Sequence, residues 1–324
     1  MTTWRMSLGP AAIAIRTDLR LAGHAGQPAV RAASDLYQLE QVTAAGAEDI
    51  SLDVELDDPG PAGMFVDPAS GNVRLRAPRA DLSADDLLFL AYLVLESRLH
   101  LHGILTLHSA AAERDGQAIL LLGHSGAGKT TTAIRLCRDH GFGFLANDLV
   151  VVGGQETARI YAGTRNITLR QSSVAAVMPD LLSHFAEASA DPWRAKIDVL
   201  PQDLAIPAGH LESEIELVVF VHSDPAYSTV LDVSGDSLAH RLNLHENALR
   251  YIRACSTPWM IGPRREYGHY VPSLDSAAAH EARTATLRRL MAMSRYIAGP
   301  PESVAGAIAG ALRSPAAASR GGAL

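Results

Sequence analysis

The sequence has little cysteine and no long apolar run, and each shortage excludes a class of protein. Cys137 and Cys255 are the only cysteines and lie far apart in the chain, so we predict small buried side chains and neither a disulfide framework nor a cysteine-based zinc site. The longest apolar runs, such as 87–95, fall far short of the roughly 18 residues that a transmembrane helix needs. The apolar stretch at 11–15 is too short for the core of a secretory leader. We therefore expect a cytoplasmic protein without a membrane partner.

An excess of positive charge is also missing. Lysine and arginine together number 28 against 35 aspartates and glutamates, which gives a formal net charge of −7 and a pI of about 6.0. Binding to a phosphate backbone requires the opposite balance, so we expect no nucleic-acid partner. With 324 residues, of which 48% are hydrophobic and 19% charged, the chain is long enough for roughly two globular domains.

Lysine itself is scarce. Lys129 and Lys196 are the only two lysines, and all other residues in the basic count are arginines. A position that keeps lysine in such a background points to a need for a compact, flexible ammonium group in place of the planar guanidinium. Both lysines are therefore candidates for a functional role.

The first hundred residues favour a strand-rich domain. Short runs of strand composition alternate there with turn residues such as the cluster at 67–72, and strands joined so tightly are typical of hairpins. Ser83 followed by Asp86 resembles a capping box and predicts a helix that reaches Leu99. We place the first domain at residues 1–100. The predicted strands are 11–15, 50–55, 64–66 and 73–75.

From residue 101 onwards, apolar runs alternate with helical patterns, which indicates an α/β domain with helices covering a sheet. We place this second domain at 101–314. The segment 315–324 consists mainly of Ala, Ser, Gly and Arg and is expected to be disordered. The expected strands are 104–107, 118–122, 144–152, 158–162, 167–169 and 215–221, and the expected helices are 129–137, 172–188 with an interruption at Pro179, 238–255 and 276–293.

The segment from Gly123 to Thr130 carries the strongest motif in the chain. It reads Gly-His-Ser-Gly-Ala-Gly-Lys-Thr, which satisfies the G-x-x-x-x-G-K-[ST] pattern of a phosphate-binding loop, and it lies between a predicted strand and a predicted helix as that loop requires. Backbone N–H groups of such a loop surround the phosphates, Lys129 reaches the β and γ oxygens, and Thr130 holds Mg²⁺. The predicted nucleotide-binding residues are Gly123, His124, Ser125, Gly126, Ala127, Gly128, Lys129, Thr130 and Thr131.

Two flanking segments narrow the choice among P-loop proteins. Upstream, His108 ends a predicted strand, and downstream Asn147 and Asp148 lie within an apolar run. A histidine-bearing strand, this loop and the Asn-Asp pair, in that order, resemble the catalytic domain of HPr kinase/phosphorylase and its related kinases over about residues 103–170, where the family has an Asp-Asp pair. The resemblance implies a P-loop kinase core of the HPr kinase/phosphoenolpyruvate carboxykinase type, with a smaller strand-rich N-terminal domain. It also implies ATP and Mg²⁺ as cofactors and a hydroxyl acceptor, either on a protein or peptide serine or on a small biosynthetic metabolite.

The roles of the family's residues carry over position by position. Lys129 and Thr130 match the phosphate and Mg²⁺ groups, and Asp148 matches the second acidic residue, which is suited to bind Mg²⁺. His108 matches the histidine that orients or tunes the acidic base. Asn147 departs from the family, because the first acidic residue normally stands there as the base for the acceptor hydroxyl, and an amide cannot take up that proton. The resemblance thus implies catalytic roles for His108, Lys129, Asn147 and Asp148 and metal ligation by Thr130 and Asp148.

The departure at Asn147 leaves several mechanisms open. Phosphoryl transfer through a loose transition state depends more on positioning and electrostatics than on a strong base, so an amide at this position need not abolish transfer. Either Asp148 takes both acidic roles, another carboxylate substitutes, or turnover is slow. Reverse phosphorylase activity is less assured than the kinase reaction.

Further polar residues outside the motifs are weaker candidates. Arg165 follows a glycine-containing bend and either faces the phosphates or remains a solvated loop residue. Lys196, which we count among the catalytic candidates, either reaches the acceptor or the γ-phosphate or lies on the surface. The pair 264–265 forms either an acceptor clamp or a solvated turn. His100 and His102 lack the further ligand spacing of a zinc site.

Three functional hypotheses follow, and a kinase with a hydroxyl acceptor is the first. The second is a P-loop ATPase or nucleotide-responsive switch that acts on a protein partner, in which the strand 215–221 followed by Asp224 serves as a displaced Walker B strand. A transporter ATPase and a GTPase are disfavoured, because neither an L-S-G-G-Q signature nor an N-K-x-D motif occurs. The third is a nucleotide-binding scaffold without catalysis. Homo-oligomerisation and the identity of the acceptor stay open.

Overall fold

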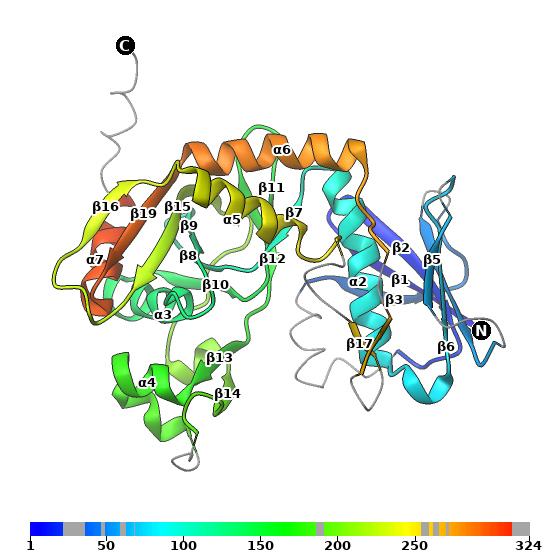
Figure 1. Cartoon of the computed structure of the whole chain (residues 1–324), viewed down its shortest axis with the longest axis horizontal. Coiled ribbons are helices and arrows are strands. Elements are labelled where there is room, and N and C mark those ends of the chain that lie inside the picture. Colours follow the sequence, from blue (N-terminus) through cyan, green and yellow to red (C-terminus); the bar gives the residue numbers. More distant parts are fainter. Residues whose placement is uncertain are drawn as a thin grey trace. The chain divides into compact units, whose positions relative to one another are not determined.

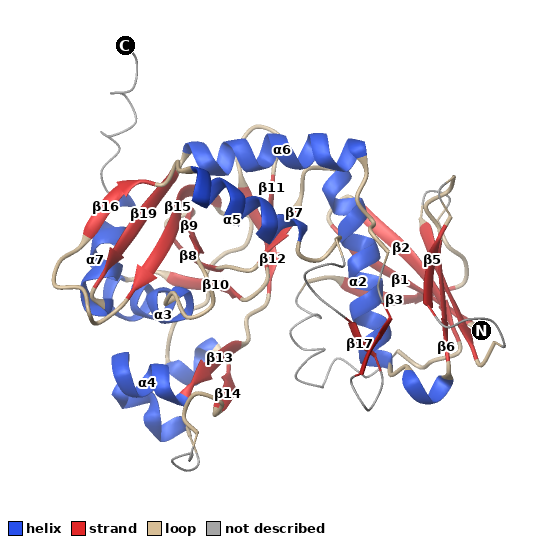
Figure 2. Ribbon diagram, in the orientation of Figure 1, coloured by secondary structure: helices blue, strands red, loops and turns tan. Residues whose placement is uncertain are grey.

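The computed structural model is a mixed α/β structure, as the sequence predicts (Figure 2). It describes residues 1–21, 36–46, 49–58, 63–67, 69–185, 191–253, 259–261, 266–269 and 272–312. The chain divides into two compact units. Unit 1 comprises Met1–Leu107, Val151–Glu156 and His245–Leu287, and unit 2 comprises His108–Val150, Thr157–Leu244 and Arg288–Leu324.

This division differs from the boundary that we placed at residue 100, because unit 1 also takes in segments from the second half of the sequence. Side chains within unit 1 attach the later segment. The Thr286 hydroxyl donates a hydrogen bond of 2.7 Å to the Gly103 carbonyl, and a guanidinium nitrogen of Arg283 lies 3.1 Å from Nδ1 of His100. Contacts between residues 183 positions apart leave no local pattern in the sequence. The predicted tail 315–324 lies outside the described residues.

Unit 1 is built on a mixed sheet and one long helix. Its elements are β1 (Thr2–Leu8), β2 (Ala11–Thr17), β3 (Gln38–Val42), β4 (Ile50–Leu56), β5 (Gly63–Val66), β6 (Val73–Ala77) and α2 (Ala84–Leu101). The strand order is β3-β1-β2-β4-β6-β5; β2, β4 and β6 are parallel, and the outer pairings are antiparallel. Helix α2 packs on β1 and β2, and the predicted capping box between Ser83 and Asp86 is confirmed.

The main sheet of unit 2 brings four strand ends to one edge (Figure 1). Its strands are β8 (Ala110–Arg114), β9 (Gln117–Leu122), β10 (Gly143–Asn147), β12 (Arg159–Gly163), β15 (Glu214–Ser223), β16 (Leu231–Ser234) and β19 (Ser294–Gly299). β8 lies between β10 and β9 and is antiparallel to both, while β15 is parallel to β9 and to β19. β9, β10, β15 and β19 therefore run in one direction, and we call the edge where they end the carboxyl edge.

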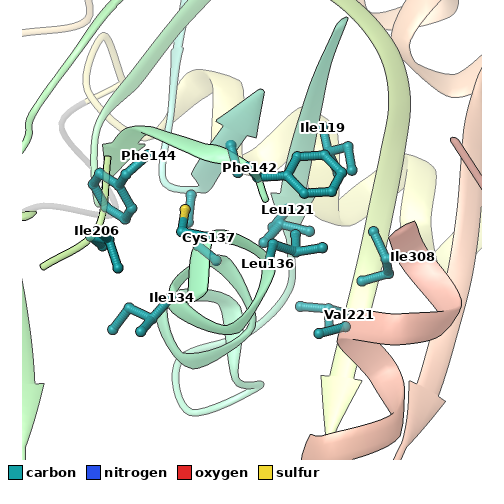
Figure 3. Close-up of a cluster of buried hydrophobic side chains, with 14 of the residues drawn as sticks. Ile119, Leu121, Ile134, Leu136, Cys137, Phe142, Phe144, Ile206, Val221 and Ile308 are labelled. Carbon is teal, nitrogen blue, oxygen red and sulfur yellow. The ribbon is translucent and has the colours of Figure 1, made fainter. Parts of the chain in front are cut away.

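Helices α3 (Lys129–His140) and α7 (Pro301–Leu312) pack on this sheet and on each other. Apolar side chains from both helices and from β9 and β15 fill the space between them, including Leu121, Leu136 and Ile308 (Figure 3). Cys137 lies in the same cluster with 4% of its surface exposed. The predicted burial of this cysteine is confirmed, and burial raises the pKa of its thiol to about 12. Such a thiol is not a nucleophile near neutral pH, and Cys255 lies outside the described residues.

The chain between β12 and β15 forms a small subassembly on the same core. It consists of β13 (Ile167–Arg170), α4 (Gln171–Val177), η3 (Pro179–His184), β14 (Lys196–Val199) and η4 (Pro201–Leu204). β13 and β14 pair as antiparallel strands, and buried residues such as Val174 join the core around α3. Arg138 of α3 forms an ion pair of 2.6 Å with Asp180. The subassembly is therefore attached to the helix that follows the Gly123–Thr130 motif.

The remaining elements are β7 (Leu105–Leu107), β11 (Val150–Gly153), α5 (Leu238–Leu249), β17 (Trp259–Ile261), β18 (Glu266–His269), α6 (Ala277–Ala292) and η2 (Arg79–Asp81). The predicted strands and helices are confirmed as element types, with three differences. The helix predicted over 238–255 ends at Leu249, and the described residues 250–253 that follow form a turn. The run 144–152 is not one strand, because a turn at Asp148 separates β10 from β11. The helix predicted over 172–188 ends at Val177 and is followed by the 3-10 helix η3.

Among the described helices, none combines the length and the apolar character that a membrane crossing requires.

Candidate active site

The phosphate-binding motif connects β9 to α3 at the carboxyl edge of unit 2. Gly128 has a φ of +90°, and a Cβ at this position would lie 2.5 Å from Cβ of Ser223. Gly123 has a φ of +146°, and its Cβ would lie 2.8 Å from the carbonyl oxygen of Val221. Any larger residue would therefore separate the loop from the end of β15, which explains both glycines in physical terms.

The first turn of α3 is arranged to attract an anion. Gly128 at the N-cap supplies no capping side chain, and the first turn contains no acidic residue, so its N–H groups and the positive end of the helix dipole favour negative charge. The buried Lys129 ammonium donates hydrogen bonds to the carbonyls of Gly123 at 3.0 Å and His124 at 3.1 Å. The Thr131 hydroxyl donates to the Gly128 carbonyl at 2.8 Å. These bonds tie the loop to the start of the helix.

Asn147 at the end of β10 is joined directly to the phosphate-binding motif. The hydroxyl of Thr130 donates a hydrogen bond of 2.7 Å to Oδ1 of Asn147. Asn147 is 1% exposed, and its Nδ2 is a buried group with no hydrogen-bond partner among the described residues. A buried donor without a partner costs roughly 1–3 kcal/mol, and such a group beside the Gly123–Thr130 motif is suited to meet a ligand oxygen.

Asp148 lies at the centre of a tight turn. Its φ is +66°, and the N–H of Leu149 donates to the carbonyl of Asn147 at 2.9 Å, which closes a three-residue γ-turn. Positive φ is uncommon outside glycine and concentrates at sites where the surrounding structure enforces it. The Asp148 side chain is half-buried. The turn thus fixes a carboxylate next to Asn147 at the carboxyl edge.

Thr164 is the residue that enforces this turn. Its backbone carbonyl accepts from the N–H of Asn147 at 2.8 Å, and its N–H donates to the carbonyl of Leu149 at 3.0 Å. Its hydroxyl donates to the Asn147 carbonyl and accepts from the Leu149 N–H at 3.3 Å. Sequence reasoning missed Thr164, and its only signal was its place beside Arg165. With 2% of its surface exposed, Thr164 holds the turn from the interior.

The start of β8 places His108 beside the same turn. Ala110 pairs with Asn147 across the antiparallel ladder, so the preceding residues 108–109 continue along the segment that carries Asp148. The His108 side chain is half-buried. The sheet register therefore brings together His108, the Asn147–Asp148 turn and the phosphate-binding loop, which the sequence motif had predicted as one site.

Arg165 and Lys196 occupy different places. Arg165 follows Thr164 directly and is half-buried, and its guanidinium forms no hydrogen bond or ion pair with any described residue. It therefore lies next to the Asn147–Asp148 turn and is available to an anion. Lys196 is exposed on β14 opposite Arg170, at the end of the hairpin away from Ile167. That end is roughly 10 Å beyond the start of β13, and a catalytic role for Lys196 stays a prediction. The pair 264–265 lies outside the described residues.

The end of β15 carries Asp224, which the sequence suggested only for a displaced Walker B strand, together with Ser223, His222 and Tyr227, to which the sequence assigned no role. The Ser223 N–H donates to the carbonyl of Ala127 at 2.9 Å, so this strand is hydrogen-bonded to the phosphate-binding loop. His222 and Asp224 flank Ser223, with Nε2 of His222 lying 4.0 Å from Oδ2 of Asp224. The ring of Tyr227 lies edge-on to that of His222, with centroids 5.6 Å apart. The signal was the apolar run 215–221, which leads straight into these residues.

The donor set at the carboxyl edge fits Mg²⁺ held together with a nucleotide. No group of three or more His, Cys, Asp or Glu side chains within the described ranges is placed to hold a metal ion. A magnesium site of this kind needs no such cluster, because Mg²⁺ keeps several waters and takes phosphate oxygens with one or two protein ligands. The Thr130 hydroxyl, Oδ1 of Asn147 and the Asp148 carboxylate are oxygen donors of the type that Mg²⁺ prefers.

Comparison of the sequence with protein-family models gave no match, and comparison with curated proteins gave none. The reading of the site therefore depends on its own geometry. A loop suited to phosphates, a hydroxyl bound to a buried amide, and a carboxylate held in a γ-turn meet at one edge of a sheet. Such an arrangement can bind a polyphosphate chain and present its terminal phosphate to an oxygen nucleophile.

Proposed function

We propose that this chain is an ATP-dependent kinase with a P-loop core of the HPr kinase/phosphoenolpyruvate carboxykinase type. It transfers the γ-phosphoryl group of ATP to a hydroxyl group on a small molecule, a peptide or a protein. The motif from Gly123 to Thr130 binds the phosphates, and Thr130 and Asp148 hold Mg²⁺, which supplies charge neutralisation at the β and γ oxygens when bound.

The observation that carries this proposal is the hydrogen bond from Thr130 to Asn147. It supports a common site for the loop and the β10 end, although β8 separates their strands in the sheet. The position of Asn147 also sharpens the role of Asp148. The buried amide interacts with the hydroxyl of the loop, whereas the half-buried Asp148 places its carboxyl group in the turn at the edge. We assign proton acceptance from the hydroxyl nucleophile to Asp148, with His108 as its neighbour, and positioning to Asn147.

The experiment follows the fate of the γ-phosphoryl group. The full-length chain is incubated with Mg²⁺ and ATP and with separate pools of hydroxyl-bearing metabolites and serine-containing peptides, and phosphorus NMR records the products. The proposal expects a new phosphate ester whose formation requires Asp148, and the Asp148→Asn variant should lose it. Consumption of ATP that yields only inorganic phosphate in every pool, at a rate that no pool changes, contradicts the kinase assignment.

A P-loop ATPase or nucleotide-responsive switch is the second candidate, and one observation favours it. β15 lies directly beside β9, is hydrogen-bonded to the phosphate-binding loop through Ser223 and leads into Asp224, which is the placement that a displaced Walker B strand requires. An acceptor-independent ATPase rate that disappears in Asp224→Asn and persists in Asp148→Asn would favour the switch. The kinase assignment expects the reverse order of sensitivity.

A further inference from the structure

The end of β15 presents two aromatic rings beside the phosphate-binding loop. The side chain of His222 is 46% exposed, and Tyr227 is 37% exposed. Their ring centroids are 5.6 Å apart at an interplanar angle of 74°. Large aromatic side chains usually bury most of their surface, so a pair that keeps its rings open to solvent at this place needs an explanation.

Backbone hydrogen bonds fix the pair relative to the loop. The Ser223 N–H donates to Ala127 at 2.9 Å, and the close approach of Ser223 to Gly128 leaves no room for a shift of the strand. Asp224 then closes the following turn, because its carboxylate accepts from the Ala226 N–H at 2.8 Å and its carbonyl accepts from the Tyr227 N–H at 3.2 Å. The rings therefore belong to the same rigid edge as the loop.

The sheet order determines which end of a nucleotide meets these rings. Asn147 and Asp148 follow β10, which lies on the β8 side of β9, whereas His222 ends β15 on the opposite side of β9. A nucleoside triphosphate carries its reacting phosphate at one end and its base at the other. With the terminal phosphate directed toward Thr130 and the Asn147–Asp148 turn, the base extends toward the β15 side of the loop.

We propose that His222 and Tyr227 form the platform for the nucleotide base, which stacks on the face of one ring and meets the edge of the other, because the two rings lie at 74° to each other. This inference rests on the proposed nucleotide site, and it adds the part of that site that binds the nucleoside. Stacking on an aromatic face suits every base, because each base has a π face. The expected ligand is thus a nucleoside triphosphate. It should bind more tightly than inorganic polyphosphate, because only the nucleotide has a base that can contact the two rings.

The experiment separates base binding from phosphate binding. Isothermal titration calorimetry on the full-length chain measures the Kd of ATP and of inorganic tripolyphosphate, each with Mg²⁺, for the wild type and for His222→Ala and Tyr227→Ala. We expect each alanine variant to weaken ATP binding about tenfold or more, the usual scale for losing one stacking ring, and to leave tripolyphosphate binding unchanged. Tyr227→Phe keeps the ring and should bind ATP as the wild type does.

A matched control comes from the opposite edge of the same sheet. His210 is exposed, and its backbone N–H binds Glu113 near the end of β8. Replacement by alanine leaves that backbone contact in place, so His210→Ala should bind both ligands normally. Equal weakening of ATP and tripolyphosphate in the His222 and Tyr227 variants would overturn the platform, since the rings would then act on the loop or the phosphates. An unchanged ATP affinity would overturn it as well.

The wild-type measurement distinguishes failure of this inference from failure of the proposed function. A wild type that binds ATP no more tightly than tripolyphosphate has a phosphate site without a base platform, which contradicts the inference alone. A wild type that binds neither ligand contradicts the nucleotide site itself, and the platform with it.

Discussion

The hydroxyl of Thr130 donates a hydrogen bond of 2.7 Å to Oδ1 of Asn147. The two residues belong to α3 and to the end of β10, whose strand is separated from the loop strand β9 by β8. The start of β8 lies between these two strands, and His108 comes two residues before Ala110, which pairs with Asn147. A buried amide and a loop hydroxyl thus define the centre of the candidate site, and predictions about the site start from this pair.

Asn147→Asp should increase phosphoryl transfer. The carboxylate has nearly the shape of the amide and can accept the same hydrogen bond from Thr130, and it adds a base beside the acceptor. A gain of up to about 10²-fold is plausible for one added base. Two adjacent carboxylates repel each other unless a cation offsets them, so the gain should need Mg²⁺ and shrink in His108→Ala.

The measurement is kcat under saturating ATP and Mg²⁺ for Asn147→Asp and for Asp148→Asn. We expect a severe loss of kcat in Asp148→Asn, because that variant removes the only carboxylate of the pair 147–148. Full activity in Asp148→Asn together with an inert Asn147→Asp would show that Asp148 is not the essential acidic residue.

Thr164→Val should lower kcat more than it alters the KM for ATP. The change removes a hydroxyl that bonds the Asn147 carbonyl and the Leu149 N–H, and it keeps the shape of the side chain. Loss of these buried bonds costs about 1–3 kcal/mol of stability and frees the turn that holds Asp148. Thr164→Ser retains the hydroxyl and should restore kcat.

Thr286→Val is the matched control for Thr164. The Thr286 hydroxyl is also buried and donates to a backbone carbonyl, that of Gly103, but it lies in unit 1. Thr286→Val should lower the melting temperature about as much as Thr164→Val does, and its kcat should be unchanged. If Thr164→Val and Thr286→Val lowered kcat equally, the effect of Thr164 would be one of stability alone.

The Glu96→Gln variant should gain stability relative to the wild type as pH rises. Glu96 and His100 are fully buried one turn apart on α2, with Oε1 and Nε2 3.5 Å apart. Burial raises the pKa of Glu96, and the contact with His100 opposes the rise only in part. The native state therefore holds this proton more tightly than the unfolded chain, whose glutamate titrates near about 4.3. The stabilisation of the folded state by protonated Glu96 is fully present below the unfolded pKa and is lost as pH rises through the pKa of Glu96 in the native state.

Chemical denaturation between pH 4 and pH 8 tests this, with the free energy of unfolding compared between the wild type and Glu96→Gln. The exposed Glu281 on α6 provides the control variant Glu281→Gln, which should show no such trend. If Glu96→Gln instead lost stability relative to the wild type as pH rose, Glu96 would be ionised in the native state.

The sequence was sufficient where the signals are local. The capping box at Ser83, the strand-loop-helix around Gly123–Thr130 and the alternation of strands and helices depend on residues a few positions apart, and the structure has these elements. The strands β1, β16 and β19 and the helix α7 were not predicted. β16, β19 and α7 pair or pack with elements far away in the sequence, as β19 does with β15, and β1 pairs with the distant β3 as well as with its neighbour β2.

The candidate site shows the same limit. The motif residues were found, but Asn147 stood out in the sequence only as a departure from a family pattern, whereas the structure places its amide against the Thr130 hydroxyl. Thr164 was missed because its bonds form only when the segment after β12 meets the end of β10, and the place of the His222–Tyr227 pair beside the loop was missed because it depends on the bond between Ser223 and Ala127. No spacing in the sequence encodes that meeting.

We propose that the Gly123–Thr130 loop binds the phosphates whose transfer this chain performs, and the Lys129→Ala variant examines that proposal at the ammonium group. The measurement is the rate of ATP consumption by wild type and variant at saturating Mg²⁺, alongside their melting temperatures. Removal of the ammonium withdraws a cation from the charge that develops between the β and γ phosphates. We predict that turnover of the variant falls almost to background, while its melting temperature and its affinity for ATP change much less from the wild-type values. Wild-type turnover in Lys129→Ala would contradict it.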